Sequence, residues 1–171
     1  MKILDQEKVY DGFFKLYKVN LQTDKGKSLI WERLVSQNGV CAVVYNTITK
    51  EYIFVKQFRS GPLEYMIEVV AGLMDCGLSP VDTIVKEINE EIGYEVDYLL
   101  ELGSPVCMSP GKCGEIIYFY YAEVSNKITN GGGIEEDGEE LEIISVPKAQ
   151  IKSLNINDGK TLIVLHRLNL L

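Results

Sequence analysis

The sequence contains little histidine and comparatively few basic residues, and both shortages limit its chemistry. Among its 171 residues the single histidine is His166, so a zinc site built on several histidines is excluded within one chain. Nucleophilic catalysis with a histidine base would have to use this same residue, and we expect it to be a structural or surface residue. Acidic side chains outnumber basic ones by 25 to 17, a net charge of −8, which disfavours nucleic-acid and anionic membrane partners.

Long apolar runs and paired cysteines are also missing. No apolar run reaches the length of a membrane span, and residues 1–10 lack the apolar core of a signal peptide. The four cysteines, Cys41, Cys76, Cys107 and Cys113, show no CxxC spacing, so we expect free thiols in a reducing cytoplasm. The 46% apolar content is enough for a proper core, and the length suits one domain with an appendage.

Apolar periodicity predicts strands that surround one internal helix. Residues 1–36 form a short leading β segment, with a hairpin whose arms are residues 10–22 and 28–36, and residues 37–171 form the main domain. Further predicted elements are strands at 40–45, 52–58, 66–71, 98–102, 115–124 and 141–146, a short helix at 147–154 and a terminal helix at 160–171. This order predicts an α/β fold of mixed α+β type, with a mixed sheet sandwiched between helices.

The clearest predicted helix lies between Ser79 and Gly93. Ser79 is a typical N-cap residue, and Pro80 follows it at the first helical position. Gly93 is expected to close the helix in a left-handed conformation. The apolar residues recur at helical spacing and predict a single buried stripe: Val81, Ile84, Val85, Ile88 and Ile92.

Three glutamates of this helix, Glu87, Glu90 and Glu91, are spaced so that they lie on one surface. Like charges at this spacing destabilise a helix by a few tenths of a kcal/mol, and the last turn of a helix disfavours anions. A bound hard cation, which needs oxygen ligands, would remove that penalty. From the helix alone, a solvated acidic face with Lys86 as its partner is the simpler interpretation.

The helix and its preceding loop resemble the Nudix box, G-x(5)-E-x(7)-R-E-U-x-E-E-x-G-U, where U is a bulky apolar residue. The positions that match in register are Gly72, Glu87, Ile88, Glu90, Glu91, Gly93 and Tyr94. Two positions depart: Lys86 replaces the usual arginine and Leu78 the usual first glutamate. Lysine keeps the charge but lacks the bidentate fork of arginine, and the first glutamate mostly supports the loop in relatives. The resemblance implies the Nudix fold and a Mg²⁺-dependent hydrolase, with Mn²⁺ as an alternative cofactor.

Other segments are similar to the nucleoside-diphosphate-sugar and ADP-ribose pyrophosphatases of this family. They are Val55–Arg59, Ile67–Leu73 and Met108–Gly111 followed by Glu115. The triple glycine Gly131–Gly133 with the acids up to Glu142, and later Asp158–Thr161, are most similar to the GDP-mannose pyrophosphatase branch, although a UDP-glucose-type branch shares the triple glycine. The resemblance implies hydrolysis of a nucleoside-diphosphate sugar to a nucleoside monophosphate and a sugar 1-phosphate. GDP-mannose is favoured, and UDP-glucose and ADP-ribose are alternatives.

The resemblance also implies the metal-binding and catalytic residues. The backbone carbonyl of Ala71 and the carboxylates of Glu87 and Glu91 would hold magnesium. Glu139, on the late acidic loop, would complete the metal site and orient the attacking water, and Glu90 joins Glu91 and Glu139 as a catalytic candidate. Two neighbouring acids are alternatives to Glu139: Asp137 and Glu140.

A second group of residues falls where relatives bind substrate. The positions that contact the diphosphate sugar are Arg59, Glu115 and Lys160, with Gly72 and Leu73 beside the metal-binding carbonyl. The positions in the leading segment that recognise the base, often across a dimer interface, are Trp31, Glu32 and Phe13. Simple surface or packing roles are the alternatives for these side chains. The resemblance implies a homodimer, and a catalytically weak nucleotide-sugar sensor is the rival from another class, favoured by Leu78 and Lys86.

Overall fold

The structure, a computed structural model, describes residues 1–74, 77–133 and 140–171. It divides into two compact units. The first comprises Met1–Asn38 and Cys107–Ile116, and the second comprises Gly39–Val106 and Ile117–Leu171. No helix of the described residues is long and apolar enough to cross a membrane.

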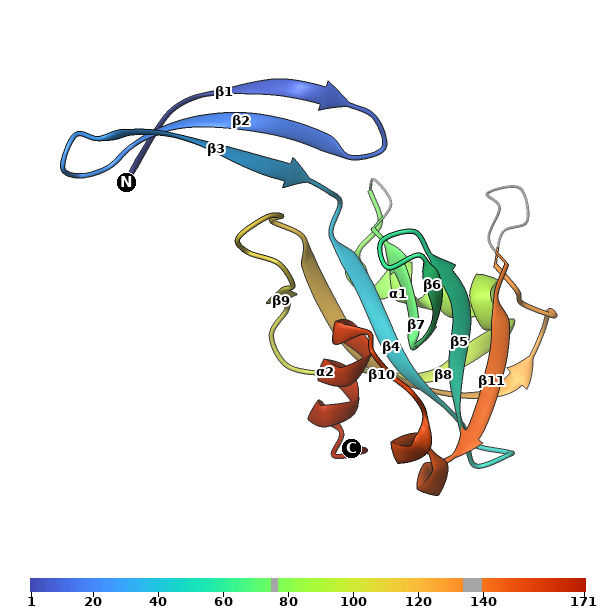
Figure 1. The fold of residues 1–171 in the computed structure, drawn as a ribbon. Helices are drawn as coiled ribbons and strands as arrows, with labels where there is room; N and C mark the ends of the chain where they lie inside the picture. The colour runs from blue at the N-terminus through green and yellow to red at the C-terminus, as the bar shows by residue number, and fades with distance from the viewer. Residues whose placement is uncertain (75–76, 134–139) are drawn as a thin grey trace. The chain divides into compact units, whose positions relative to one another are not determined.

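The first unit contains a three-stranded antiparallel sheet in the order β1-β2-β3 (Figure 1). Its strands are β1 (Lys2–Asp11), β2 (Lys15–Gln22) and β3 (Ser28–Val35). The predicted arm at residues 10–22 was wrong in its start, because the chain turns at Gly12, whose N–H donates to the carbonyl of Phe14 (3.2 Å). The turn makes residues 2–11 a separate strand, which pairs back along β2.

The second unit is built on a mixed sheet with the strand order β11-β5-β4-β10-β8 (Figure 1). These strands are β4 (Gly39–Asn46), β5 (Glu51–Arg59), β8 (Tyr94–Glu101), β10 (Ile116–Lys127) and β11 (Glu142–Pro147). Three shorter strands pair with them: β6 (Glu64–Glu68) with β5, β7 (Val70–Leu73) with β4, and β9 (Val106–Cys107) with β10. The sheet is mixed because β10 runs parallel to β4, whereas the neighbours along the rest of the strand order are antiparallel, as are β6 and β7 to their partners.

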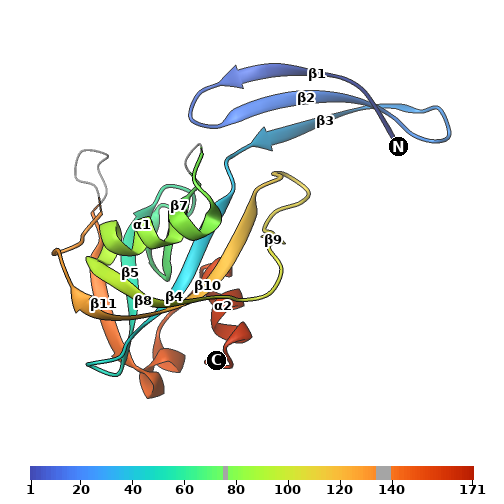
Figure 2. The same ribbon diagram turned by 180° about the vertical axis from the view of Figure 1, so that it is seen from behind.

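Two helices cover opposite faces of this sheet, α1 (Pro80–Ile92) and α2 (Gly159–Arg167), as the two views show (Figure 1, Figure 2). Alternate residues of β4, including Val40 and Ala42, pack with Ile84 and Ile88 of α1. The intervening Cys41 lies on the other face of the strand, where burial raises the pKa of its thiol to about 12. The predicted α/β sandwich with a mixed sheet is confirmed.

The caps of α1 follow the prediction, but its buried face differs. The hydroxyl of Ser79 accepts from the N–H of Asp82 (3.1 Å), and Gly93 closes the helix at φ 78°. Val81 and Val85 are 47% and 39% exposed, so the predicted stripe was wrong for these two. The side chains that are buried instead include two polar ones: Thr83, Ile84, Ile88, Glu91 and Ile92.

Three further elements differ from their predicted form. The strand expected at 66–71 is divided into β6 and β7 at Val69, whose N–H donates to the hydroxyl of Thr161 (3.0 Å). The short helix is a 3₁₀ helix, η2 (Lys148–Ser153). Helix α2 ends at Arg167 rather than at Leu171, because Asn169 adopts a positive φ of 52°, which an α-helix cannot continue.

Candidate active site

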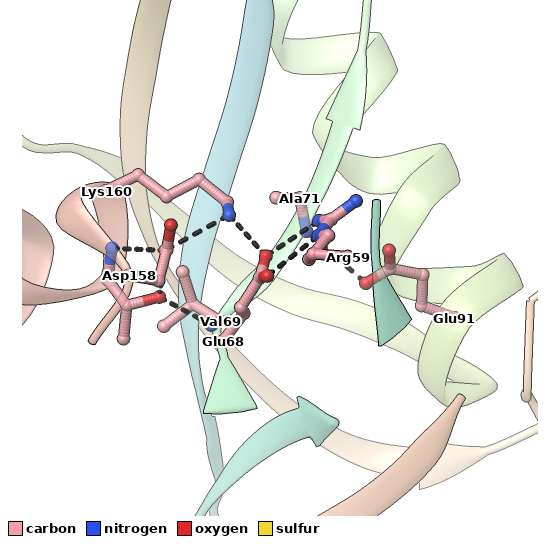
Figure 3. Close-up of polar contacts among 8 residues, drawn as sticks. Arg59, Glu68, Val69, Ala71, Glu91, Asp158 and Lys160 are labelled. Carbon is pink, nitrogen blue, oxygen red and sulfur yellow. Dashed lines mark hydrogen bonds and ion pairs between the residues drawn. The ribbon is translucent and has the colours of Figure 1, made fainter. Parts of the chain in front are cut away.

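Two glutamates of α1 lie against two consecutive residues of β7. The carboxylate of Glu91 accepts a hydrogen bond from the N–H of Ala71 (3.3 Å; Figure 3). The carboxylate of Glu87 lies so close to Gly72 that a Cβ at this glycine would be 2.1 Å from its carboxyl carbon. The strand and the helix therefore bring together Ala71, Glu87 and Glu91, the three residues expected to hold the metal.

The third glutamate of the helix is held differently. Glu90 forms an ion pair with Lys86, with 3.2 Å between Nζ and Oε2. Both side chains are partly exposed, whereas Glu91 is 4% exposed. The acidic residues of α1 are therefore not one solvated face, since one carboxylate is buried against the sheet and one is paired along the helix.

The donor set on β7 and α1 suits a hard divalent cation, because it consists of two carboxylates and a neighbouring backbone carbonyl. Among the described residues, no group of three or more His, Cys, Asp or Glu side chains forms a metal site on its own. Glu139 and its alternative Asp137 lie outside the described residues, while Glu140 is described and exposed.

The triple glycine that precedes the late acids lies against the end of α1. The N–H of Gly132 donates to the carbonyl of Glu91 (2.8 Å), and the N–H of Gly133 donates to the carbonyl of Glu90 (3.3 Å). Gly131, Gly132 and Gly133 all have positive φ angles, between 68° and 110°, which side-chain-bearing residues rarely adopt. The triple glycine thus satisfies carbonyls at the end of the glutamate-bearing helix.

A buried carboxylate at the end of β6, Glu68, holds two cations (Figure 3). Arg59 donates to it twice, from Nε to Oε1 and from Nη2 to Oε2, each at 2.7 Å. The ammonium group of Lys160 donates to the same Oε2. Glu68 is 1% exposed, and the side chains of Arg59 and Lys160 are 37% and 14% exposed.

Charge compensation keeps this group ionised. Burial raises the pKa of Glu68, but the hydrogen bonds and charges of Arg59 and Lys160 outweigh it and lower the pKa below its ordinary value. The hydrogen bonds from Arg59 to Glu68 raise the pKa of the guanidinium, and the nearby charge of Glu91 adds to this effect. Arg59 and the carboxylate of Glu91 on α1 therefore interact electrostatically.

The start of α2 completes the network. Asp158 is the N-cap of this helix, and its Oδ2 accepts from the N–H (2.9 Å) and the hydroxyl (2.7 Å) of Thr161. The same oxygen accepts from Lys160 (3.1 Å). Since the hydroxyl of Thr161 also accepts from the N–H of Val69, the first turn of α2 is bonded to the junction of β6 and β7.

The remaining expected substrate residues belong to the first unit, apart from Leu73, which is 37% exposed at the end of β7. Phe13 lies in the turn between β1 and β2, is 80% exposed, and contacts Phe14 edge-on with 5.0 Å between ring centroids. Trp31, in β3, is 53% exposed. Two acids complete this group: Glu32, exposed in β3, and Glu115, partly buried just before β10.

Three residues of the network had no role predicted from the sequence: Glu68, Asp158 and Thr161. A signal for Glu68 was present, because a carboxylate between Ile67 and Val69 in a predicted apolar strand requires a partner if it is buried. The spacing of Asp158 and Thr161 is that of an N-cap side chain and the third helical residue. His166 is exposed in the last turn of α2, at the other end of the helix from Asp158.

Comparisons with known proteins identify the family of this chain. Residues 35–165 match the family model of the NUDIX domain. The GDP-mannose pyrophosphatase of Escherichia coli (strain K12) is 37% identical to this chain. The alignment is 176 residues long and covers 92% of this chain and 89% of the relative. The enzyme of the same name from Shigella flexneri is 36% identical over 94% of this chain and 90% of its own length.

A solved structure described as an ADP compounds hydrolase has a TM-score of 0.81. It covers 98% of this chain and 91% of its own, at 20% sequence identity, and so supports the fold. The family model and the two pyrophosphatases share with this chain a region that contains the Ala71, Glu87 and Glu91 constellation. The chain therefore belongs to the Nudix hydrolase family.

Proposed function

We propose that this chain hydrolyses the pyrophosphate bond of a nucleoside-diphosphate sugar, with GDP-mannose as the favoured substrate. The products would be a nucleoside monophosphate and a sugar 1-phosphate. The observation that carries the proposal is the packing of the Glu87 and Glu91 carboxylates against Ala71 and Gly72. Supporting it, relatives named GDP-mannose pyrophosphatase match almost the whole chain.

Nudix hydrolases generally use divalent metals, and we take the metal in this chain to be Mg²⁺, with Mn²⁺ as the alternative. Glu87, Glu91 and the carbonyl of Ala71 would hold it, because hard oxygen donors suit this ion. When bound, such an ion polarises a phosphoryl group and activates water. Glu139 would complete the site from the late acidic loop.

The two cations of the site, Arg59 and Lys160, would bind the diphosphate group of the substrate. Arg59 and Lys160 would donate hydrogen bonds to diphosphate oxygens, and such charge-assisted bonds are about twice as strong as neutral ones. Their positive charges also reduce repulsion between an anionic substrate and the glutamates of α1. Trp31, Glu32, Phe13 and Glu115 would contact the base and sugar.

The chain would act as a homodimer in the cytoplasm. The three cysteines within the described residues, Cys41, Cys107 and Cys113, are free thiols, which is typical of proteins from a reducing compartment. Large apolar side chains of the first unit are exposed, and a second copy would cover them.

The test is a panel of GDP-mannose, UDP-glucose and ADP-ribose with Mg²⁺, read out as phosphate released by a coupled phosphatase. We expect GDP-mannose to be turned over fastest and EDTA to abolish the reaction. Glu91→Gln should lower kcat by at least about a hundredfold, since loss of even an outer partner of a metal ligand costs ten- to a hundredfold. The exposed Glu101→Gln, in β8, is the matched control and should retain activity.

Each alternative has its own result in this panel. Fastest turnover of UDP-glucose or ADP-ribose would change the substrate and leave the reaction standing. Calorimetric binding of a nucleotide sugar without turnover would favour the sensor. Near-normal activity of Glu91→Gln, with an unchanged melting temperature, would overturn the proposed site.

A further inference from the structure

Glu68 joins two cations that come from distant parts of the sequence. Three donor atoms converge on its two oxygens, Nε and Nη2 of Arg59 and Nζ of Lys160. Arg59 lies at the end of β5 and Lys160 in the first turn of α2, while Glu68 itself ends β6. One carboxylate therefore accepts three charge-assisted hydrogen bonds and connects three elements.

Each cation keeps a donor that Glu68 does not use. Arg59 binds Glu68 through Nε and Nη2, so its third nitrogen, Nη1, takes no part in holding the carboxylate. The ammonium group of Lys160 has three donors, of which Glu68 and Asp158 take two. The arrangement therefore immobilises both side chains while leaving hydrogen-bond capacity for an anion.

The charges of the network balance without a ligand. Arg59 and Lys160 are compensated by Glu68 and Asp158, so that the buried carboxylate is paired, as a buried charge must be. The cations consequently need no phosphate to be held in place. A substrate would meet side chains that are already ordered, and less conformational entropy would be lost on binding.

The network is also attached to the strand that carries the metal-binding backbone. Thr161, next to Lys160, accepts from the N–H of Val69, two residues before Ala71. Figure 3 shows Arg59 between Glu68 and Glu91, with Ala71 beside it. The cation pair is therefore fixed relative to the same short segment against which Glu87 and Glu91 pack.

We infer that Glu68 is a positioning residue, which holds Arg59 and Lys160 in register with the Ala71–Gly72 segment so that both cations meet one diphosphate group. This inference rests on the proposed function. Glu68 is 1% exposed and both of its oxygens accept hydrogen bonds from the two cations, so it acts through them and does not contact the substrate. Glu68 contributes by orienting the two donors in advance. Without it, the side chains of Arg59 and Lys160 would have to become oriented when the substrate binds.

The test is a double-mutant cycle between Glu68→Gln and Arg59→Ala, measured as kcat/KM for GDP-mannose and as the dissociation constant of GDP-mannose in EDTA by calorimetry. Glu68→Gln alone should weaken both quantities about tenfold, as expected for a lost charge-assisted bond. In the Arg59→Ala background the same change should cost less than about threefold, because residues that act as a unit are not additive. Glu123→Gln is the matched control, since Glu123 is partly buried and accepts a hydrogen bond from Tyr121 (2.9 Å) outside the site.

Glu68→Asp keeps the buried charge if Glu68→Gln does not fold. Aspartate is one methylene shorter and cannot reach both cations, so we expect a folded protein with kcat/KM lowered about fivefold or more. Additive effects in the cycle, or wild-type kinetics of Glu68→Asp, would overturn the inference. A wild-type chain that binds GDP-mannose without hydrolysing it would instead overturn the proposed function, and the cycle on the dissociation constant would still decide the role of Glu68. Failure of the wild-type chain to bind at all would overturn both.

Discussion

Gly72 is the residue at which the site depends most directly on the absence of a side chain. A Cβ at this position would lie 2.2 Å from Oε1 and 2.5 Å from Oε2 of Glu87. Since these atoms are the end of a flexible side chain, Gly72→Ala should move the carboxylate rather than unfold the protein. We expect kcat/KM to fall about tenfold or more, while the free energy of unfolding changes by less than about 1 kcal/mol.

Steady-state kinetics with a Mg²⁺ titration, together with urea denaturation, would measure both effects. Gly61→Ala is the control for this substitution, because a Cβ there meets no described atom within 4 Å and the glycine does not have a positive φ. Unchanged kinetics of Gly72→Ala at every Mg²⁺ concentration would show that the position of the Glu87 carboxylate is not required.

At the scale of elements, Gly93 both ends α1 and holds the helix against residues 128 and 129. Gly93 has a φ of 78°, and its carbonyl accepts from the N–H groups of Ile128 and Thr129. A Cβ at Gly93 would lie 2.2 Å from the carbonyl oxygen of Thr129, which is backbone and cannot rotate away. The end of α1 and the chain that leads to the triple glycine are therefore packed through this one residue.

Gly93→Ala should destabilise the protein by about 2–4 kcal/mol, which combines the strain of a positive φ with the displacement of a backbone segment. Gly103→Ala isolates the first effect, because Gly103 has a φ of 68° but its nearest described atom, on Arg167, would be 3.6 Å away. We expect about 1 kcal/mol for this control. Equal losses for the two variants in chemical denaturation would show that the contact with Thr129 contributes nothing.

Local signals predicted α1 well and its surroundings less well. Ser79, Pro80 and Gly93 specify the helix ends through their own backbone preferences, so neighbouring sequence was sufficient. The break at Val69 was not predicted, because it depends on Thr161, which is 92 residues away. Val85 was assigned to the core by periodicity, whereas the bond from Ala71 to Glu91 places a carboxylate among the buried residues of the helix.

The same limit applied to the site. The resemblance to the Nudix box implied Ala71, Glu87 and Glu91 as metal-binding positions, and one strand and the helix that follows it carry all three. The joint contact of Arg59 and Lys160 with Glu68 could not be inferred, since it is formed by three elements whose pairing the sequence does not state. Contacts between residues of different strands and helices can be identified only when the strand order is known.

At the scale of the whole molecule, the net charge of −8 is compatible with an anionic substrate because the charges are arranged in groups. Arg59 and Lys160 are neutralised by Glu68 and Asp158, while Glu87 and Glu91 lie on the neighbouring helix. A divalent cation would compensate those two glutamates and the phosphates together. The acidic composition therefore does not exclude a phosphate-containing substrate. It predicts that such a substrate binds together with a metal ion.

The exposed apolar side chains of the first unit predict that two copies of the chain associate. Every residue of β1 is exposed, and several large apolar side chains of this unit are 41–80% exposed, among them Val9, Phe13 and Ile30. Monomeric proteins rarely expose so many apolar side chains on one small sheet. We expect a dimer mass for the full chain in light scattering coupled to size exclusion.

Ile30→Lys should weaken that dimer, because it places a charge among these apolar side chains, and the dissociation constant should rise about tenfold or more. Ile48→Lys is the matched control, since Ile48 is 72% exposed and Ile30 is 68% exposed, but Ile48 lies in the turn between β4 and β5 of the second unit. A monomeric wild-type mass at working concentration would contradict dimerisation itself. A dimer that is weakened by Ile48→Lys and not by Ile30→Lys would instead place the interface on the second unit, and the exposed sheet would then need another explanation.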